Sequence, residues 1–138
     1  MKAIIIAAGM GNRLNPYTKD IPKCLLEIGG TTLLENLIKN LRELNIKDIA
    51  IVVGHLANKI NLEGVTYFTN DNYVNNNILH SLMYAKKFMD DDVIISYSDI
   101  WVTQSILEKV SSVNGDIVVS VDTQWERHYK GRKEHPVS

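Results

Sequence analysis

The chain has 138 residues and a mass of 15.6 kDa, which is enough for one domain with a packed core. Apolar residue types make up 45% and charged types 22%, a globular composition that excludes intrinsic disorder and collagen-like repeats. Fifteen Lys and Arg against sixteen Asp and Glu give a formal net charge of -1, so no general basic field exists for a nucleic-acid partner.

The cysteine and histidine content and the amino-terminal segment indicate a reduced, cytoplasmic protein. Cys24 is the single cysteine and has no partner for an internal disulfide. The four histidines have no Cys or His neighbours at the spacing of a zinc site. The apolar run near Met1 is too short to span a membrane or to act as a typical signal region, so no membrane partner is expected.

The first half of the chain alternates strand and helix patterns. A β-branched run over residues 2–7 predicts a strand that is covered on both faces. Thr32 followed by Glu35 has the spacing of a capping box, and leucines at helical spacing predict a helix over 32–44. Residues 48–53 and 65–69 predict a second strand and a short third one.

The second half continues the alternation. Residues 78–89 predict a helix, which the asparagines before it can cap, and residues 92–97 predict another buried strand. A helix over 105–113 and a fifth strand over 116–121 follow, and from Thr123 onward the polar chain has no clear periodicity and is expected to be a loop. We therefore expect a single α/β domain over 1–138, with a mostly parallel sheet and helices on both faces.

A glycine-rich loop follows the first strand and has the properties of a phosphate cradle. Gly9 and Gly11 allow backbone N–H groups to approach an anion, and Arg13 and Lys23 add positive charge. The alternative from the glycines alone is a tight turn with solvated basic residues. Leu14 stands where the dinucleotide fingerprint has its third glycine, and no Gly-Lys-Ser or Gly-Lys-Thr triplet of a P-loop occurs, which disfavours both classes.

The stretch AAGMGNRL with Pro22-Lys23 resembles the signature loop of the nucleotidyltransferases that join a nucleoside triphosphate to a sugar phosphate or an alcohol phosphate. The resemblance implies a Rossmann-like fold in which Ala8, Gly9 and Gly11 wrap the triphosphate. It also implies that Arg13 stabilises the departing pyrophosphate and that Lys23 holds the phosphates while the acceptor attacks.

A carboxylate after a later strand predicts a metal ligand. Asp99 follows the strand over 92–97, and a carboxylate at the carboxyl end of a strand is well placed to bind Mg²⁺ beside phosphates. The alternative is that Asp99 only ends the turn before Trp101.

Two segments resemble the phosphocholine cytidylyltransferase-like branch of the family, namely residues 75–82 and 121–132. Asn76 and Ser81 would then contact the base and ribose, or else serve as a helix cap and polar loop. Trp125 and Tyr129 would form part of an aromatic cage for the choline ammonium, or else pack against the sheet or a dimer partner. Asp122 or Glu126 would add a counter-charge, whereas Arg127, Lys130 and Arg132 suit the acceptor phosphate or a more anionic substrate.

The resemblance covers nearly the whole chain, but family members are longer, so we expect a sheet that is incomplete at its C-terminal side. No residue after Asp122 can be assigned as the second metal-binding aspartate. The sequence thus predicts a Mg²⁺-dependent nucleotidyltransferase with CTP and phosphocholine as its substrates. A sugar-1-phosphate transferase using UTP or dTTP and a non-catalytic nucleotide-binding module remain alternatives, and an exposed sheet edge would favour a homodimer.

Overall fold

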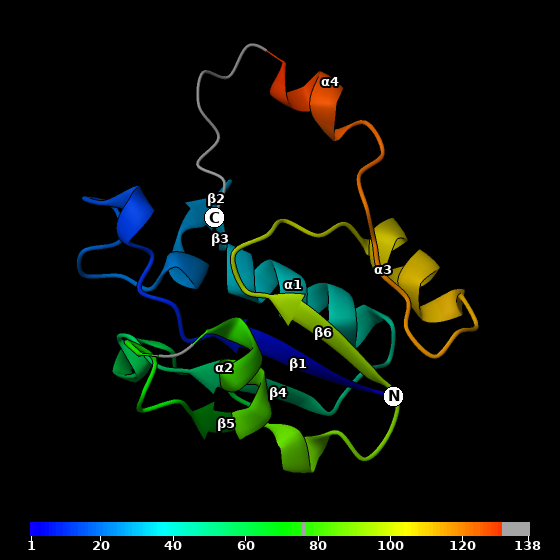
Figure 1. The fold of residues 1–138 in the computed structure, drawn as a ribbon, viewed down its shortest axis with the longest axis horizontal. Coiled ribbons are helices and arrows are strands. Elements are labelled where there is room, and N and C mark those ends of the chain that lie inside the picture. The colour runs from blue at the N-terminus through cyan, green and yellow to red at the C-terminus, as the bar shows by residue number, and fades with distance from the viewer. Residues whose placement is uncertain (76, 131–138) are drawn as a thin grey trace.

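The core of the molecule is a four-stranded parallel sheet. The computed structural model describes residues 1–75 and 77–130. The sheet has the order β5-β4-β1-β6 and consists of β1 (Lys2–Ala7), β4 (Ile49–Val53), β5 (Thr66–Thr69) and β6 (Val93–Tyr97) (Figure 1). Ile5 of β1 lies opposite Ile51 on one side and Ser96 on the other. The parallel sheet confirms the predicted α/β class.

Helices cover both faces of this sheet, as predicted. α1 (Leu33–Glu43) and α3 (Gln104–Ser112) pack on one face, and α2 (Ile78–Tyr84) packs on the other (Figure 1). A short antiparallel hairpin of β2 (Glu27–Ile28) and β3 (Thr31–Thr32) precedes α1 and was not expected from the sequence. Within the described residues, no helix is long and apolar enough to cross a membrane.

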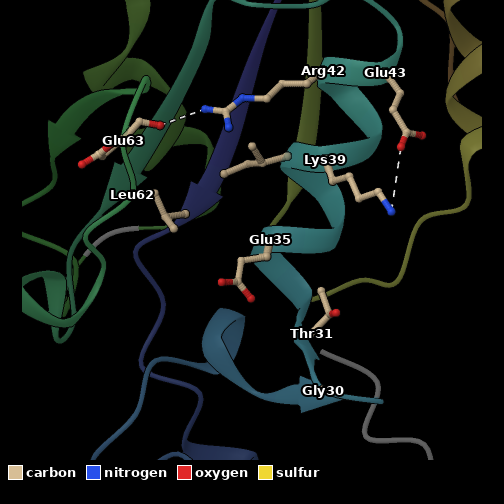
Figure 2. Close-up of a pocket in the computed structure, with 9 residues that line it drawn as sticks. Gly30, Thr31, Glu35, Lys39, Arg42, Glu43, Leu62 and Glu63 are labelled. Atoms are coloured by element: carbon tan, nitrogen blue, oxygen red, sulfur yellow. Dashed lines mark hydrogen bonds and ion pairs between the residues drawn. The ribbon is translucent and has the colours of Figure 1, made fainter.

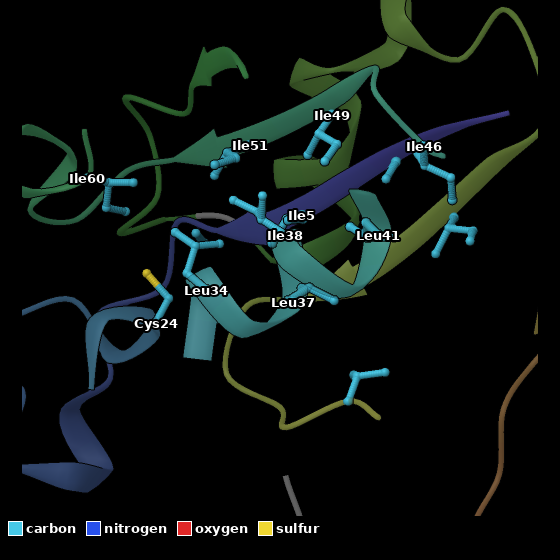
Figure 3. Packing of buried hydrophobic residues seen from close by; sticks show 14 of the residues in the cluster. Ile5, Cys24, Leu34, Leu37, Ile38, Leu41, Ile46, Ile49, Ile51 and Ile60 are labelled. Carbon is cyan, nitrogen blue, oxygen red and sulfur yellow. The ribbon is translucent and has the colours of Figure 1, made fainter. Parts of the chain in front are cut away.

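α1 begins where the capping box predicts. The Thr32 hydroxyl accepts a hydrogen bond from the Glu35 backbone N–H at 3.1 Å, and the Glu35 carboxylate accepts one from the Thr32 N–H at 3.0 Å. Its leucines then lie against the sheet, where Leu34, Leu37 and Leu41 are fully buried (Figure 3). This packing fixes α1 across β1 and β4.

The strand β1 is buried on both faces because each face has its own cluster of apolar side chains. Ile5 packs into the cluster under α1, together with Ile49 and Ile51 (Figure 3). Ile4 packs on the other side with Ala50 and Val52, beneath side chains of α2 and the turn after it. β1 therefore occupies the interior of the sheet and delivers the loop that follows it to the sheet's carboxyl edge.

Two sequence predictions about strands are wrong. No strand forms over residues 116–121, where Ile117, Val119 and Val121 are all more than two thirds exposed, because the segment leaves α3 away from the sheet and gains no ladder partner. The second concerns β6, which lies at the edge of the described sheet, with Ile95 and Tyr97 half exposed, and is not buried on both faces.

The remaining differences are smaller. The helix predicted over 78–89 ends at Tyr84 and continues as a 3-10 turn over Lys86–Phe88. The polar segment predicted as a loop contains the short helix α4 (Trp125–Tyr129), which lies apart from the sheet at the end of an extended stretch (Figure 1). Neither difference alters the arrangement of the sheet's carboxyl edge.

Candidate active site

The loop after β1 is held tightly against the end of β4. The Ala8 carbonyl accepts a hydrogen bond from the His55 backbone N–H at 3.2 Å, and Ala8 itself is 2% exposed. A Cβ added to Gly54 would lie 2.9 Å from the Ala8 carbonyl oxygen, so glycine at position 54 allows this close approach. Ala8 therefore anchors the loop, with its carbonyl turned to the protein.

The two glycines of the loop have different surroundings. Gly11 has φ +66°, and its carbonyl accepts a hydrogen bond from the Thr18 hydroxyl at 2.8 Å. A Cβ at Gly11 would also lie 3.4 Å from the side chain of Thr18, which is 2% exposed. Gly9 has no neighbour within 4 Å of an added Cβ, so its backbone faces open space. The loop thus offers an open backbone surface of the kind that an anion needs.

A pocket of about 410 Å³ opens in front of this loop. Within the described chain, Asp99 supplies the one carboxylate that lines it, and Arg13 and Lys23 supply the cationic side chains. The structure therefore brings Gly9, Gly11 and all three charged residues together around one pocket. The remaining lining residues are Ile6, Ala7, Met10, Asn12, Leu14, Cys24, Ile78, Tyr97 and Ser98.

Lys23 and Asp99 form an ion pair across the pocket, although 76 positions separate them in the chain. The Lys23 Nζ lies 2.6 Å from the Asp99 Oδ2, and each side chain is about one third exposed. Lys23 begins a 3-10 turn after Pro22, and Asp99 comes two residues after β6. The ammonium and the carboxylate remain reachable by a ligand because neither is fully buried.

The segment that carries Asp99 is fixed from α1. The Val102 carbonyl accepts hydrogen bonds from the amides of Asn40 at 2.7 Å and Asn36 at 3.2 Å. Val102 and Asn40 are both buried. Two side chains on consecutive turns of one helix thus hold the chain three residues beyond Asp99, a role that the helical pattern of α1 did not reveal.

Cys24 is a buried residue that lines the pocket. Burial raises the pKa of its thiol to about 12, and the negative charge of Asp99 acts in the same direction. The thiol therefore stays protonated at neutral pH and supplies no nucleophile.

The structure does not bring Ser81 or Trp125 to this pocket. Ser81 is 6% exposed, accepts a hydrogen bond from the Asn70 amide at 2.9 Å and does not line the pocket. Trp125 is 56% exposed on α4, and Tyr129 lies in the same helix. Asn76 lies outside the described residues. Ile78 at the start of α2 lines the pocket instead, and it belongs to the segment over 75–82 in which the predicted contacts were the polar residues.

The donor set around Asp99 matches one mode of Mg²⁺ binding. No group of three or more His, Cys, Asp or Glu side chains that would enclose a metal ion occurs in the part of the chain that the structure describes. Mg²⁺ is usually held by only one or two carboxylates together with substrate phosphates and water. A single, partly exposed carboxylate beside an open glycine loop fits that arrangement.

A larger groove of about 760 Å³ lies along α1, away from the glycine loop (Figure 2). Its Arg42 donates a hydrogen bond to the Glu63 carbonyl at 2.8 Å, and its Lys39 lies 3.9 Å from Glu43 (Figure 2). The groove also contains the carboxylates of Glu35, Glu43 and Glu63. Because three carboxylates line this groove beside only two cations, its net charge repels a triphosphate.

The parallel sheet places a glycine loop, a lysine and an aspartate at its carboxyl edge, where open α/β sheets bind their ligands. The chain belongs to the family of MobA-like NTP transferase domains, whose sequence model matches residues 3–137. Both the predicted family and the predicted Rossmann-like fold are thereby confirmed.

Cytidylyltransferases are among the similar proteins. The chain is 35% identical to the CTP:phosphoglutamine cytidylyltransferase of Campylobacter jejuni, over 99% of this chain and 58% of that protein. It is 38% identical to the choline-phosphate cytidylyltransferase of Streptococcus pneumoniae, over 69% of this chain and 43% of that protein. The chain thus spans about half the length of these relatives.

Solved structures show the same likeness. The CTP:phosphocholine cytidylyltransferase of Streptococcus pneumoniae superposes with a TM-score of 0.62 at 36% identity, over 71% of this chain and 44% of that one. A putative glucose-1-phosphate thymidylyltransferase of Bacillus anthracis gives a TM-score of 0.68 at 27% identity, over 80% and 50%. A cytidylyltransferase and a putative thymidylyltransferase thus share this fold.

Proposed function

We propose that this protein transfers a nucleoside monophosphate from a nucleoside triphosphate to a small phosphorylated acceptor. The observation that carries the proposal is the convergence of the open glycine loop, Lys23 and Asp99 on one pocket. Such a pocket supplies the two requirements of the reaction, which are a phosphate cradle and charge stabilisation at the transferring phosphorus.

In the proposed reaction, an oxygen of the acceptor phosphate attacks the α-phosphorus, the α–β phosphoanhydride bond breaks and pyrophosphate leaves. The backbone from Gly9 to Gly11 would bind the triphosphate while buried Ala8 anchors the loop, Arg13 would offset the charge of the departing pyrophosphate, and Lys23 would hold the phosphates. Asp99 would hold Mg²⁺, which supplies neutralisation of phosphate charge when bound.

CTP and phosphocholine are the proposed substrates. The names of the cytidylyltransferase relatives support CTP, and one of them carries choline phosphate in its name. Trp125, which is exposed on α4, would provide the predicted cation–π contact with the ammonium, with Tyr129 of the same helix. Asn76 and Ser81 remain the predicted contacts of the base and ribose. The hydroxyl of Ser81 is buried in α2, so it would have to become accessible to the ligand.

A sugar-1-phosphate transferase using UTP or dTTP is the second candidate. The likeness to a putative glucose-1-phosphate thymidylyltransferase favours it, since that structure superposes over 80% of this chain. The choice of acceptor separates the two candidates.

The test is Mg²⁺-dependent pyrophosphate release by the chain with each of the four nucleoside triphosphates, paired with phosphocholine, phosphoglutamine or glucose 1-phosphate. We expect release with CTP and one of the first two acceptors, and loss of release in Lys23→Ala and Asp99→Ala. Lys39→Ala serves as the control because Lys39 is exposed on α1 outside the pocket. Retained CTP binding without turnover for any pair would contradict the transferase and support a nucleotide-binding module.

A further inference from the structure

The ion pair between Lys23 and Asp99 joins two groups that have separate proposed ligands. Lys23 is the proposed phosphate ligand and Asp99 the proposed Mg²⁺ ligand, yet their charged atoms lie 2.6 Å apart. While this contact exists, the carboxylate is partly neutralised and one donor of the ammonium is in use. Neither group is then fully available to its ligand.

Two features strengthen the ion pair between Lys23 and Asp99. Both side chains are only about one third exposed, so their attraction is screened less than that of a fully exposed surface pair. The segment beyond Asp99 is also fixed by the bonds from Asn36 and Asn40 to Val102, and Lys23 lies in an ordered turn. The pair is therefore held together by the backbone on both sides.

A ligand that arrives alone meets an unfavourable charge. A divalent cation at Asp99 must displace the Lys23 ammonium and then lies beside an unpaired positive charge. A metal-free triphosphate that draws Lys23 away leaves the Asp99 carboxylate facing its own negative charge. When both arrive, Lys23 turns to a phosphate and Asp99 to the cation, and each charge is compensated.

We propose that Lys23 and Asp99 form an exchange pair, in which each masks the other in the empty site, so that the cation and the nucleotide strengthen each other's binding. This inference rests on the proposed function. The ion pair lowers the affinity of the site for the cation alone and for the nucleotide alone. The coupling is reciprocal, because each ligand must change the affinity for the other by the same factor.

The first arm of the test measures binding of Mn²⁺ alone by the loss of its free-ion electron paramagnetic resonance signal. Lys23→Met should bind Mn²⁺ more tightly than the unaltered chain by roughly tenfold, a coupling of usual size. The double variant with Asp99→Asn should lose this gain. Lys19→Met is the matched control, since Lys19 is an exposed lysine of the same loop that does not line the pocket.

The second arm measures CTP binding by calorimetry with excess EDTA. Asp99→Asn should bind metal-free CTP more tightly than the unaltered chain, again by roughly tenfold, because Lys23 is released and a negative charge is removed. Thermal unfolding of each variant verifies that it is folded, and either arm can be read alone if one variant does not fold.

The outcomes separate the inference from the proposed function. Equal Mn²⁺ affinity in Lys23→Met and the unaltered chain, or metal-free CTP affinity that does not rise in Asp99→Asn, overturns the exchange pair. Absence of CTP binding with Mg²⁺ present overturns the proposed function, while the Mn²⁺ arm still decides whether Lys23 masks Asp99.

Discussion

Gly9 and Gly11 are two residues apart in one loop, and their geometry assigns them different roles. Gly11→Ala should lower the free energy of unfolding by about 1–2 kcal/mol, because a φ of +66° is strained for a residue that carries a Cβ. Gly9→Ala should leave stability within about 0.5 kcal/mol, since its methyl enters open space. It should nevertheless weaken CTP binding at least roughly tenfold by obstructing the cradle.

Chemical denaturation and CTP titration of both variants check this assignment. A Gly9→Ala variant that binds CTP normally would show that the open side of Gly9 is not where the phosphates lie.

Thr18 is a positioning residue that sequence reasoning missed. Its hydroxyl donates to the Gly11 carbonyl at 2.8 Å from a buried position, so it holds the loop in the shape that exposes Gly9. Thr18→Val keeps the volume and removes the donor. We expect the KM for the nucleotide to rise roughly fivefold, equivalent to about 1 kcal/mol, with little change in kcat.

Thr18→Ser is the matched control, because it retains the hydroxyl and should restore the KM. A KM defect of the same size in Thr18→Ser, which retains the hydroxyl, would contradict a role for the hydrogen bond.

At the scale of elements, the capping box makes the stability of α1 dependent on pH. Hydrogen bonds from the backbone and hydroxyl of Thr32 hold the pKa of the Glu35 carboxyl below its ordinary value. A lowered pKa in the folded state stabilises the protein above the ordinary glutamate pKa, and this contribution is lost as the pH falls through the folded value.

The free energies of unfolding of the unaltered chain and Glu35→Gln, measured between about pH 3 and pH 7, test this effect. The difference between the two should be largest at neutral pH and should shrink on acidification. A difference that is constant over this pH range would contradict the capping interaction. Separately, Thr32→Ala should lower the free energy of unfolding by about 1 kcal/mol at neutral pH.

The elements that could be predicted are those whose patterns are local. The β-branched run of β1 and the capping box of α1 each determine their element from adjacent residues, and the structure confirms both. The segment over 116–121 is also rich in β-branched residues, but a strand needs a neighbour for its backbone, and the sequence does not specify one. The position of β6 at the edge likewise depends on the order of the strands in the sheet, which its own residues do not determine.

The candidate site follows the same rule. Gly9, Gly11, Arg13 and Lys23 were identifiable because the loop motif places them close together in sequence. The contact of Lys23 with Asp99 and the hydrogen bonds of Asn40 depend on the fold, since they join residues 76 and 62 positions apart. Ser81 was predicted from a resemblance of its segment, but the packing of α2 turns it towards Asn70.

At the scale of the whole molecule, the proposed function requires that the nucleotide binds in the pocket before the glycine loop and not in the groove along α1. The groove along α1 is the larger, but three carboxylates line it, whereas the pocket before the glycine loop has two cations, one carboxylate and an open backbone. The chain spans about half the length of its cytidylyltransferase relatives. The homodimer that the exposed sheet edge favours stays a prediction.

The most direct test is a map of backbone amide chemical shifts in the 138-residue chain during titration with CTP and Mg²⁺. We predict that the largest changes occur at Gly9, Gly11 and Lys23 and spread to Asp99, while Lys39 and Glu63 of the α1 groove remain unchanged. Changes concentrated along the α1 groove, or none at the glycine loop under saturating CTP, would contradict it.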